Sequence, residues 1–246
     1  MSALYDDIGK TYGRYRKPDG RIARAIDAAL SNARSVASVG SGTGSYEPRA
    51  REVVAVEPSR TMIEQRPPDA APVVQGVAEH LPLHDESFDA ALAVLTVHHW
   101  PDPQGGLMEM TRIACRQVVL TWDPLIARRF WLVAEYLPEL AEFESGLATL
   151  DAACAALEVI DVLPVPVPWD CTDGFCGAYW RRPHHYLDPA ARAAISGLSL
   201  MDQNTVARAM RQLEDDLANG TWDNRYADLA GAAEMDLGYR LVIAGK

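Results

Sequence analysis

The chain has 246 residues, of which 48% are hydrophobic and 23% charged, proportions typical of an ordinary globular protein. This length fits one large α/β domain, or a core domain with a modest cap, and it can bury a core without disulfides or a metal. The 23 basic residues against 34 acidic ones give a formal charge of −11, which disfavours a protein that grips phosphate backbones. We therefore expect no nucleic-acid partner.

Export and membrane insertion find no support in the sequence. The first residues lack the basic stretch and apolar run of a signal peptide, and no uninterrupted apolar run is long enough for a spanning helix. The four cysteines are few and scattered, as in a cytosolic protein with reduced thiols. Cys171 and Cys176, followed by His184 and His185, do not have the spacing of a structural zinc motif, so we expect no metal. We expect a cytoplasmic protein without membrane insertion, and the sequence does not indicate its oligomeric state.

The first half of the chain alternates strand-like and helical patterns. An amphipathic helix over 19–32 comes first, and another over 105–114 precedes the fifth strand. Strands are expected at residues 35–39, 52–57, 72–76, 88–94 and 117–121. Such alternation predicts βαβ units and a doubly wound, mostly parallel sheet whose strand ends meet at one edge.

After Asp123 the pattern changes. Helices are expected at residues 127–137, 147–157 and 202–218, with strands at 158–165 and 239–244. We expect an N-terminal helical cofactor cover (1–34), a core (35–165), a helical cap that forms the substrate insertion (166–235) and a closing core strand (236–246). The aromatic residues at 130–131 and 179–186 either cover a substrate pocket or pack in the core.

A glycine-rich turn, Gly40-Ser41-Gly42-Thr43-Gly44, directly follows the first strand. Glycines allow a sharp turn and the close approach of a ligand, although a plain tight turn has the same composition. A dinucleotide site is a second alternative, but its G-x-G-x-x-G spacing would need glycine where Ser45 stands. The following helix is also expected to be very short, which is poor support for a pyrophosphate.

Glu57 ends the second strand, where its carboxylate either accepts hydrogen bonds from both ribose hydroxyls or faces water. A third segment, Ala78-Glu79-His80-Leu81-Pro82, follows the third strand. Together with Val-Gly-Ser-Gly-Thr-Gly, Val-Ala-Val-Glu-Pro-Ser-Arg-Thr-Met and Ser-Phe-Asp-Ala, it makes residues 36–123 resemble the type 11 methyltransferases, typified by ubiquinone and menaquinone C-methyltransferases.

This resemblance implies a class I methyltransferase fold, Rossmann-like, with seven strands of which the last is antiparallel, and S-adenosylmethionine as cofactor. It implies that Gly40 and Gly42 contact the methionine part of the cofactor, Glu57 the ribose, and Ala78-Glu79 the adenine. Met62 would pack near the purine, or else in the helix core. The complete set of expected cofactor-binding residues is Tyr12, Arg16, Gly40, Ser41, Gly42, Gly44, Glu57, Pro58, Met62, Ala78 and Glu79.

Two further segments have candidate roles. Tyr12 and Arg16 are expected to share one face of a helix. In similar enzymes such an Arg can pair with the cofactor carboxylate. Alternatively, the charge of Arg16 is simply solvated. His98 and His99 follow the fourth strand and are the candidate catalytic bases, or else they pack the loop with Trp100. Because the cofactor carries its own electrophile, positioning alone can provide much of the rate and a base is not obligatory.

The sequence therefore predicts an S-adenosylmethionine-dependent methyltransferase that acts on a small molecule. An NAD(P)-dependent oxidoreductase, or a protein that binds S-adenosylmethionine without transferring its methyl group, remain the alternatives.

Overall fold

The computed structural model describes residues 12–245, and one seven-stranded sheet organises them. Its strand order is β3-β2-β1-β4-β5-β9-β6; the strands from β3 to β5 are parallel, whereas β9 runs antiparallel to both β5 and β6. The strands are β1 (Ser35–Val39), β2 (Glu52–Glu57), β3 (Val73–Gln75), β4 (Phe88–Val94), β5 (Ala114–Trp122), β6 (Val159–Pro164) and β9 (Tyr239–Gly245). The predicted α/β sheet with an antiparallel last strand is confirmed.

Helices cover both faces of the central strands. Successive strand residues point to opposite sides, so each strand contributes side chains to both faces. On one face Val36 and Leu92 pack with α3 (Gly20–Ala29). On the other face Ala37 and Ala91 pack with α5 (Pro103–Ile113) and α8 (Leu150–Ala156). Helices on both faces explain why these strands are apolar along their length and do not alternate.

Aspartates begin three of the longer helices. Asp19 accepts a hydrogen bond from the Arg21 backbone N–H at the start of α3, and Asp102 accepts one from Gly105 at the start of α5. Asp202 does the same with Thr205 at the start of α11. Each side chain satisfies an amide that the helix itself leaves unpaired.

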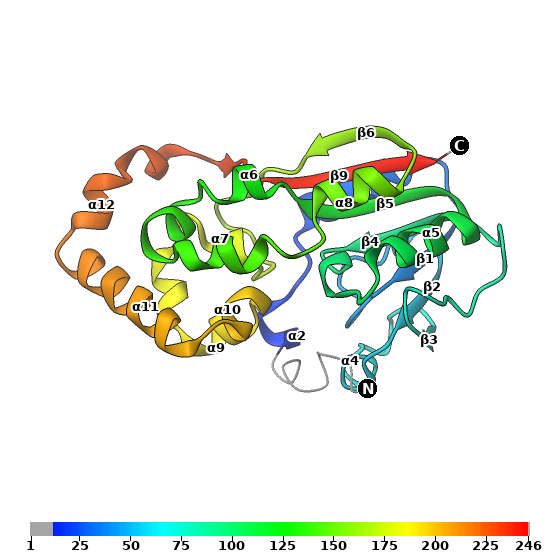
Figure 1. Cartoon of the computed structure of the whole chain (residues 1–246), viewed down its shortest axis with the longest axis horizontal. Helices are drawn as coiled ribbons and strands as arrows, with labels where there is room; N and C mark the ends of the chain where they lie inside the picture. The colour runs from blue at the N-terminus through cyan, green and yellow to red at the C-terminus, as the bar shows by residue number, and fades with distance from the viewer. Residues whose placement is uncertain (1–11, 246) are drawn as a thin grey trace.

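A helical layer lies at one end of the sheet (Figure 1). Its elements come from two parts of the chain, 124–149 and 166–231. They are α6 (Pro124–Ala127), the π-helical turn η3 (Leu132–Tyr136), α7 (Pro138–Glu144), η4 (Cys176–Tyr179), η5 (Pro183–Leu187), α9 (Pro189–Ala193), α10 (Ser196–Leu200), α11 (Gln203–Ala218), α12 (Thr221–Arg225) and η6 (Ala227–Gly231). A short two-stranded antiparallel sheet of β7 (Val167–Pro168) and β8 (Glu234–Met235) joins this layer to the core.

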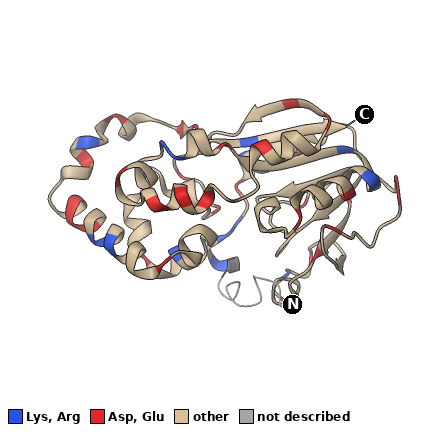
Figure 2. Cartoon of the chain, viewed as in Figure 1, with Lys and Arg blue, Asp and Glu red and all other residues tan. Residues whose placement is uncertain are grey.

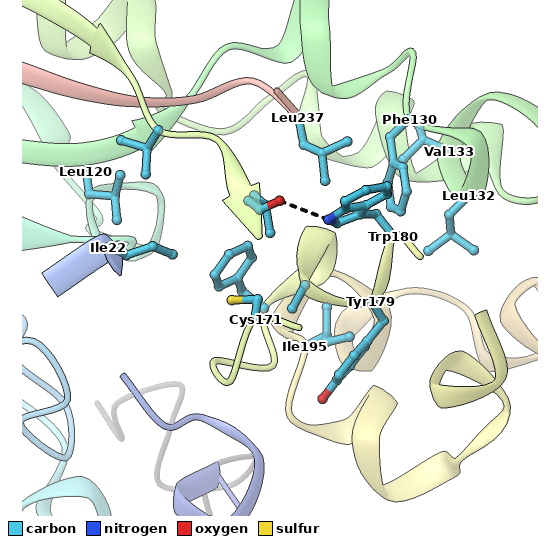
Figure 3. Close-up of a cluster of buried hydrophobic side chains, with 14 of the residues drawn as sticks. Ile22, Leu120, Phe130, Leu132, Val133, Cys171, Tyr179, Trp180, Ile195 and Leu237 are labelled. Carbon is cyan, nitrogen blue, oxygen red and sulfur yellow. Dashed lines mark hydrogen bonds between the residues drawn. The ribbon is translucent and has the colours of Figure 1, made fainter. Parts of the chain in front are cut away.

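Most aromatic side chains of this layer form its core. The indole N–H of Trp180 donates to the Val167 carbonyl at 2.9 Å, beside Phe130 and Val133 (Figure 3). Trp131 donates to the Trp180 carbonyl at 2.7 Å and meets the Tyr186 ring edge-on. Trp131, Trp180 and Tyr186 are all buried. For these three, the core interpretation of the aromatic segments is confirmed.

Three predicted helices differ in the structure. No helix follows the glycine turn, because residues 40–51 form turns only. The helix predicted at 127–137 is divided into α6 and η3, and Pro138, which was expected to stop it, instead begins α7. The helix predicted at 147–157 is the shorter α8. Within residues 12–245, no helix has the length and apolar character needed to cross a bilayer.

A candidate site of two adjoining cavities

The glycine turn lies where β1 ends, and two of its glycines have separate reasons to be there. Gly40 has a φ of +64°, and a Cβ at this position would lie 2.2 Å from the Thr96 hydroxyl in the loop after β4. Gly42 has a φ of +54°, and a Cβ there would lie 3.3 Å from the end of Met62. Both positions therefore need a residue that is free to adopt the left-handed region, and Gly40 also lets two loops approach closely.

A buried ion pair that the sequence analysis missed holds this turn from outside. Arg66 donates to the Ser41 hydroxyl at 3.2 Å, to the Gly42 carbonyl at 3.1 Å and to Glu47 at 2.5 Å. Both charged side chains are almost fully buried. The turn is thus braced by side chains in place of the expected helix, and nothing in the spacing of Arg66 and Glu47 announces that they meet.

Glu57 ends β2 directly beside the turn and is buried. One carboxylate oxygen accepts the Gly42 amide at 2.8 Å, and the other accepts the Ser59 amide at 2.9 Å. A carboxylate has about four acceptor positions, so these two contacts do not by themselves exclude a bound ribose. The structure therefore gives Glu57 one role, shaping the turn, that is compatible with the predicted one.

Parallel strands β3, β2, β1 and β4 all end at this edge, and their loops surround a cavity of about 700 Å³. That volume is within the range of small-molecule sites, roughly 300–1,000 Å³. The predicted residues that line it are Arg16, Gly40, Ser41, Gly42, Glu57, Pro58, Met62, Ala78, Glu79 and His99. Gly44 is not among its lining residues, and the side chain of Tyr12 lies outside the described part of the structure.

The residues that line this cavity fit an adenosyl group with an amino-acid tail. Glu57, the acid expected for the ribose, and the glycine turn both line it, and Met62 and Ala78 give apolar surface for a purine. Glu79 lines the cavity and also accepts the Asp102 amide at 3.2 Å, which ties it to the loop after β4. The turn lacks the helix N-terminus that a pyrophosphate favours, so the fit to a dinucleotide is poorer.

A second cavity, of about 100 Å³, adjoins the first, and we call it the acceptor chamber. Arg16, Leu95 and His99 line both cavities. Most other walls are apolar side chains of the core and of the helical layer, including Phe130, Leu140, Phe143, Phe175, Ile195, Leu200 and Leu237. These three shared residues lie where the two cavities meet, and we call this place the junction.

Leu95 and His99 lie at this junction, and His98 lies beside them in the acceptor chamber. Leu95 has a φ of +49°, a conformation that is strained for a residue with a Cβ, and such strain gathers at functional sites. His98 lines only the acceptor chamber and meets Trp122 edge-on at 4.7 Å between ring centroids. Burial lowers the pKa of His98, and it lowers the pKa of His99 to about 4 with a contribution from Arg16. Both imidazoles are therefore neutral near pH 7.

Arg16 reaches both cavities from the N-terminal segment. It forms an ion pair with Asp173 at 2.5 Å, and Tyr46 donates to the same carboxylate at 3.0 Å. The Asp173 side chain is 1% exposed and that of Arg16 10%, so the solvated interpretation of Arg16 is wrong. The partner seen here is an aspartate of the helical layer, and contact of Arg16 with the cofactor stays a prediction.

Comparison with known proteins agrees with this architecture. The methyltransferase-domain family model matches residues 37–120. A crystal structure of a "putative methyltransferase from antibiotic biosynthesis pathway" of Anabaena variabilis is 34% identical, with a TM-score of 0.84 over 94% of this chain and 99% of that one. Geranyl diphosphate C-methyltransferase of Streptomyces coelicolor, solved with S-adenosyl-L-homocysteine, shares the fold at 14% identity and a TM-score of 0.52, over 91% of this chain and 74% of that one.

Among curated proteins, an uncharacterized methyltransferase of Mycobacterium tuberculosis is 34% identical over 51% of this chain. The match covers 55% of that protein, so the chain spans about half the length of the curated relatives it matches. These matches do not place the chain in the ubiquinone and menaquinone branch. The full-length similarity to the Anabaena structure shows that the chain belongs to the class I S-adenosylmethionine-dependent methyltransferases, with S-adenosylmethionine as its cofactor.

Proposed function

We propose that this protein transfers the methyl group of S-adenosylmethionine to a small molecule held in the acceptor chamber. The observation that carries the proposal is that two cavities adjoin at the junction of Arg16, Leu95 and His99. One cavity fits the cofactor, and the other is a mostly apolar space beside it. A nucleophile in the chamber can thus face the cofactor while the surrounding side chains exclude water.

In this proposal the glycine turn holds the methionine part of the cofactor, and Glu57 holds the ribose. Ala78, Met62 and Glu79 surround the adenine. These roles agree with the positions of the side chains around the cavity. Gly44 supports the turn from outside the cavity, because its backbone N–H donates a hydrogen bond to the Ser41 carbonyl at 2.9 Å.

The cofactor supplies an electrophilic methyl group, so the protein must chiefly orient the acceptor. His98 and His99 are neutral near pH 7 and can accept a proton from an acceptor that loses one. Their lowered pKa values make them weak bases, which favours orientation and water exclusion as their larger contribution. A small acceptor is also in keeping with the description of the Anabaena relative as part of an antibiotic biosynthesis pathway.

Calorimetry with S-adenosylmethionine and its demethylated product tests the proposal. We expect both to bind, and Glu57→Ala to weaken binding about 10- to 100-fold, the cost of lost hydrogen bonds to a charged group. Glu64→Ala, an exposed acid on α4 (Arg60–Glu64), is the matched control and is expected to bind normally.

Failure of both compounds to bind would refute the proposal, and binding of NADH in their place would favour the oxidoreductase alternative. Tight binding of S-adenosylmethionine without methyl transfer to any member of a broad panel of small acceptors would favour the non-catalytic alternative. Product analysis by mass spectrometry detects the added methyl group directly.

A further inference from the structure

Helix α7 carries three glutamates with three different surroundings, and Figure 2 shows acidic residues gathered along it. Glu139 forms an ion pair with Arg208, with 2.7 Å between the carboxylate oxygen and the guanidinium nitrogen. Glu142 is exposed to solvent. Glu144, the last residue of the helix, lines the acceptor chamber.

Among the described residues, Glu144 has neither an ion pair nor a side-chain hydrogen bond. The ionisable groups that share the chamber with it are Arg16, His98, His99, Cys176 and Tyr239. Arg16 is paired with Asp173, and burial keeps both histidines neutral near pH 7. Burial raises the pKa values of Cys176 and Tyr239, so these two are neutral as well. The chamber therefore contains an acid without a compensating positive charge of its own.

An unpaired carboxylate in an apolar space is costly, and it either keeps its proton or meets a cation. Burial raises the pKa of Glu144 to about 7, so the empty chamber holds this acid half-ionised at neutral pH. A positive ligand would shift Glu144 to its charged form and pair with it. The aromatic rings of Phe130, Phe143 and Phe175 in the same wall can also attract a cation.

We infer that Glu144 selects acceptors that carry a protonated amine, and that it anchors this ammonium group by an ion pair within the aromatic chamber. The inference rests on the proposed function, since it assigns the acceptor class of that same site. Glu144 lines the chamber and not the cofactor cavity, whereas Leu95 and His99 at the junction line both.

This placement separates the anchor from the reacting atom. A protonated nitrogen has no free electron pair, so the ammonium held by Glu144 is not the atom that is methylated. The methylated atom is a different atom of the acceptor, at the end of the molecule that reaches the junction. A chamber of about 100 Å³ is smaller than the cavity of about 150 Å³ that holds a benzene molecule, so it takes one end of an acceptor.

Propylamine and propanol test the anchor, because they match in shape, differ in charge and are smaller than benzene. Their affinities are measured by calorimetry at about pH 8, with the protein saturated with S-adenosylhomocysteine. We expect propylamine to bind about tenfold or more tightly than the alcohol, the strength of one charge-assisted contact. Since the carboxylate must ionise to pair, the affinity for propylamine should fall towards about tenfold per pH unit below pH 7.

Glu144→Gln should lose the preference for the amine and its pH dependence, whereas Glu142→Gln, which removes the same charge from the exposed side of the same helix, should keep both. Equal affinities in the wild type, no binding of propylamine, or a preference that survives in Glu144→Gln would each overturn the inference. Binding of S-adenosylhomocysteine is measured separately on each variant. Its loss from the wild type would refute the proposed function, and its retention isolates any failure to the amine anchor.

Discussion

Glu144 also changes the stability of the empty protein with pH. Its pKa in the folded chain is about 7, above the ordinary value of 4.5, because burial disfavours the charged form. The folded state thus holds this proton more tightly than the unfolded chain does, and its contribution to the unfolding free energy is lost as the pH rises from about 4.5 through about 7.

Glu144→Gln removes this titration. We expect the melting temperature of Glu144→Gln, relative to the wild type, to be higher at about pH 8 than at about pH 5. Thermal unfolding without ligand measures it, and Glu142→Gln provides the reference for an exposed charge. A difference that does not change with pH, or that falls as the pH rises, contradicts the assigned burial of this carboxylate.

Gly40 links the turn to the loop after β4, and Gly40→Ala should disturb both. The left-handed φ alone costs about 1–3 kcal/mol of unfolding free energy for a residue with a side chain. The added carbon would also meet Thr96, so the variant should bind S-adenosylmethionine less tightly. Thr96→Ala in the same chain should restore part of the binding, since it relieves contact but not strain. Gly231→Ala, where no atom lies within 4 Å, should change little in denaturant unfolding and calorimetry; an equal effect there would refute this account.

Residues differ in how far the sequence can predict their surroundings. Glu57 could be assigned to a cavity because a strand end beside a glycine turn has a defined place in a parallel sheet. Glu144 could not, because one glutamate in a short acidic helix has no distinguishing pattern. Only the packing of α7 decides that Glu142 meets water and Glu144 meets the chamber.

The loop at 170–173 of the helical layer contacts the N-terminal segment and offers a matched pair of acids. Asp173 forms a buried pair with Arg16, whereas Asp170 forms an exposed pair with Arg21. Asp173→Ala removes the buried ion-pair partner of Arg16, so we expect a loss of about 3–5 kcal/mol of unfolding free energy. Asp170→Ala should cost about 0–1 kcal/mol.

Urea unfolding of the two variants measures these losses. Because Arg16 lines both cavities, Asp173→Ala should also weaken binding of S-adenosylmethionine, while Asp170→Ala should not. Similar stability losses in the two variants would show that burial of the Arg16–Asp173 pair does not increase the contribution of the pair to the unfolding free energy.

Elements follow from the sequence where one period persists. The strands of the sheet and α11 were predicted within a few residues, because apolar runs or a 3.6-residue period define them along their length. The segments 40–51 and 127–137 were predicted wrongly, since turns, a π-helical turn and a proline that begins a helix depend on tertiary contacts. The segment 40–51 keeps its shape through Arg66 and Glu47, which lie outside any local pattern.

At the scale of the whole molecule, the sheet and the helical layer share one hydrophobic cluster. It runs from Val36 and Leu92 on the sheet to Trp180 and Leu213 in the layer. The sequence could predict that a helical insertion exists, but not that it shares a core with the sheet, because that depends on how buried faces from distant segments meet. A continuous core predicts that the two parts unfold together.

Thermal unfolding followed by two signals tests this prediction. Near-ultraviolet circular dichroism reports on packed aromatic side chains, and three of the four buried tryptophans, Trp131, Trp180 and Trp222, lie in the layer. Far-ultraviolet circular dichroism reports on the whole backbone. We expect coincident transitions, and S-adenosylhomocysteine at 100 times its dissociation constant should stabilise the fold by about 2.7 kcal/mol. At about 2–4 °C per kcal/mol for a chain of this size, both transitions should rise together by about 5–10 °C. If the tryptophan signal melted first and did not respond to the ligand, the layer would be a separately folding unit, and the N-terminal segment with its Arg16–Asp173 pair would be too weak to couple it to the cofactor cavity.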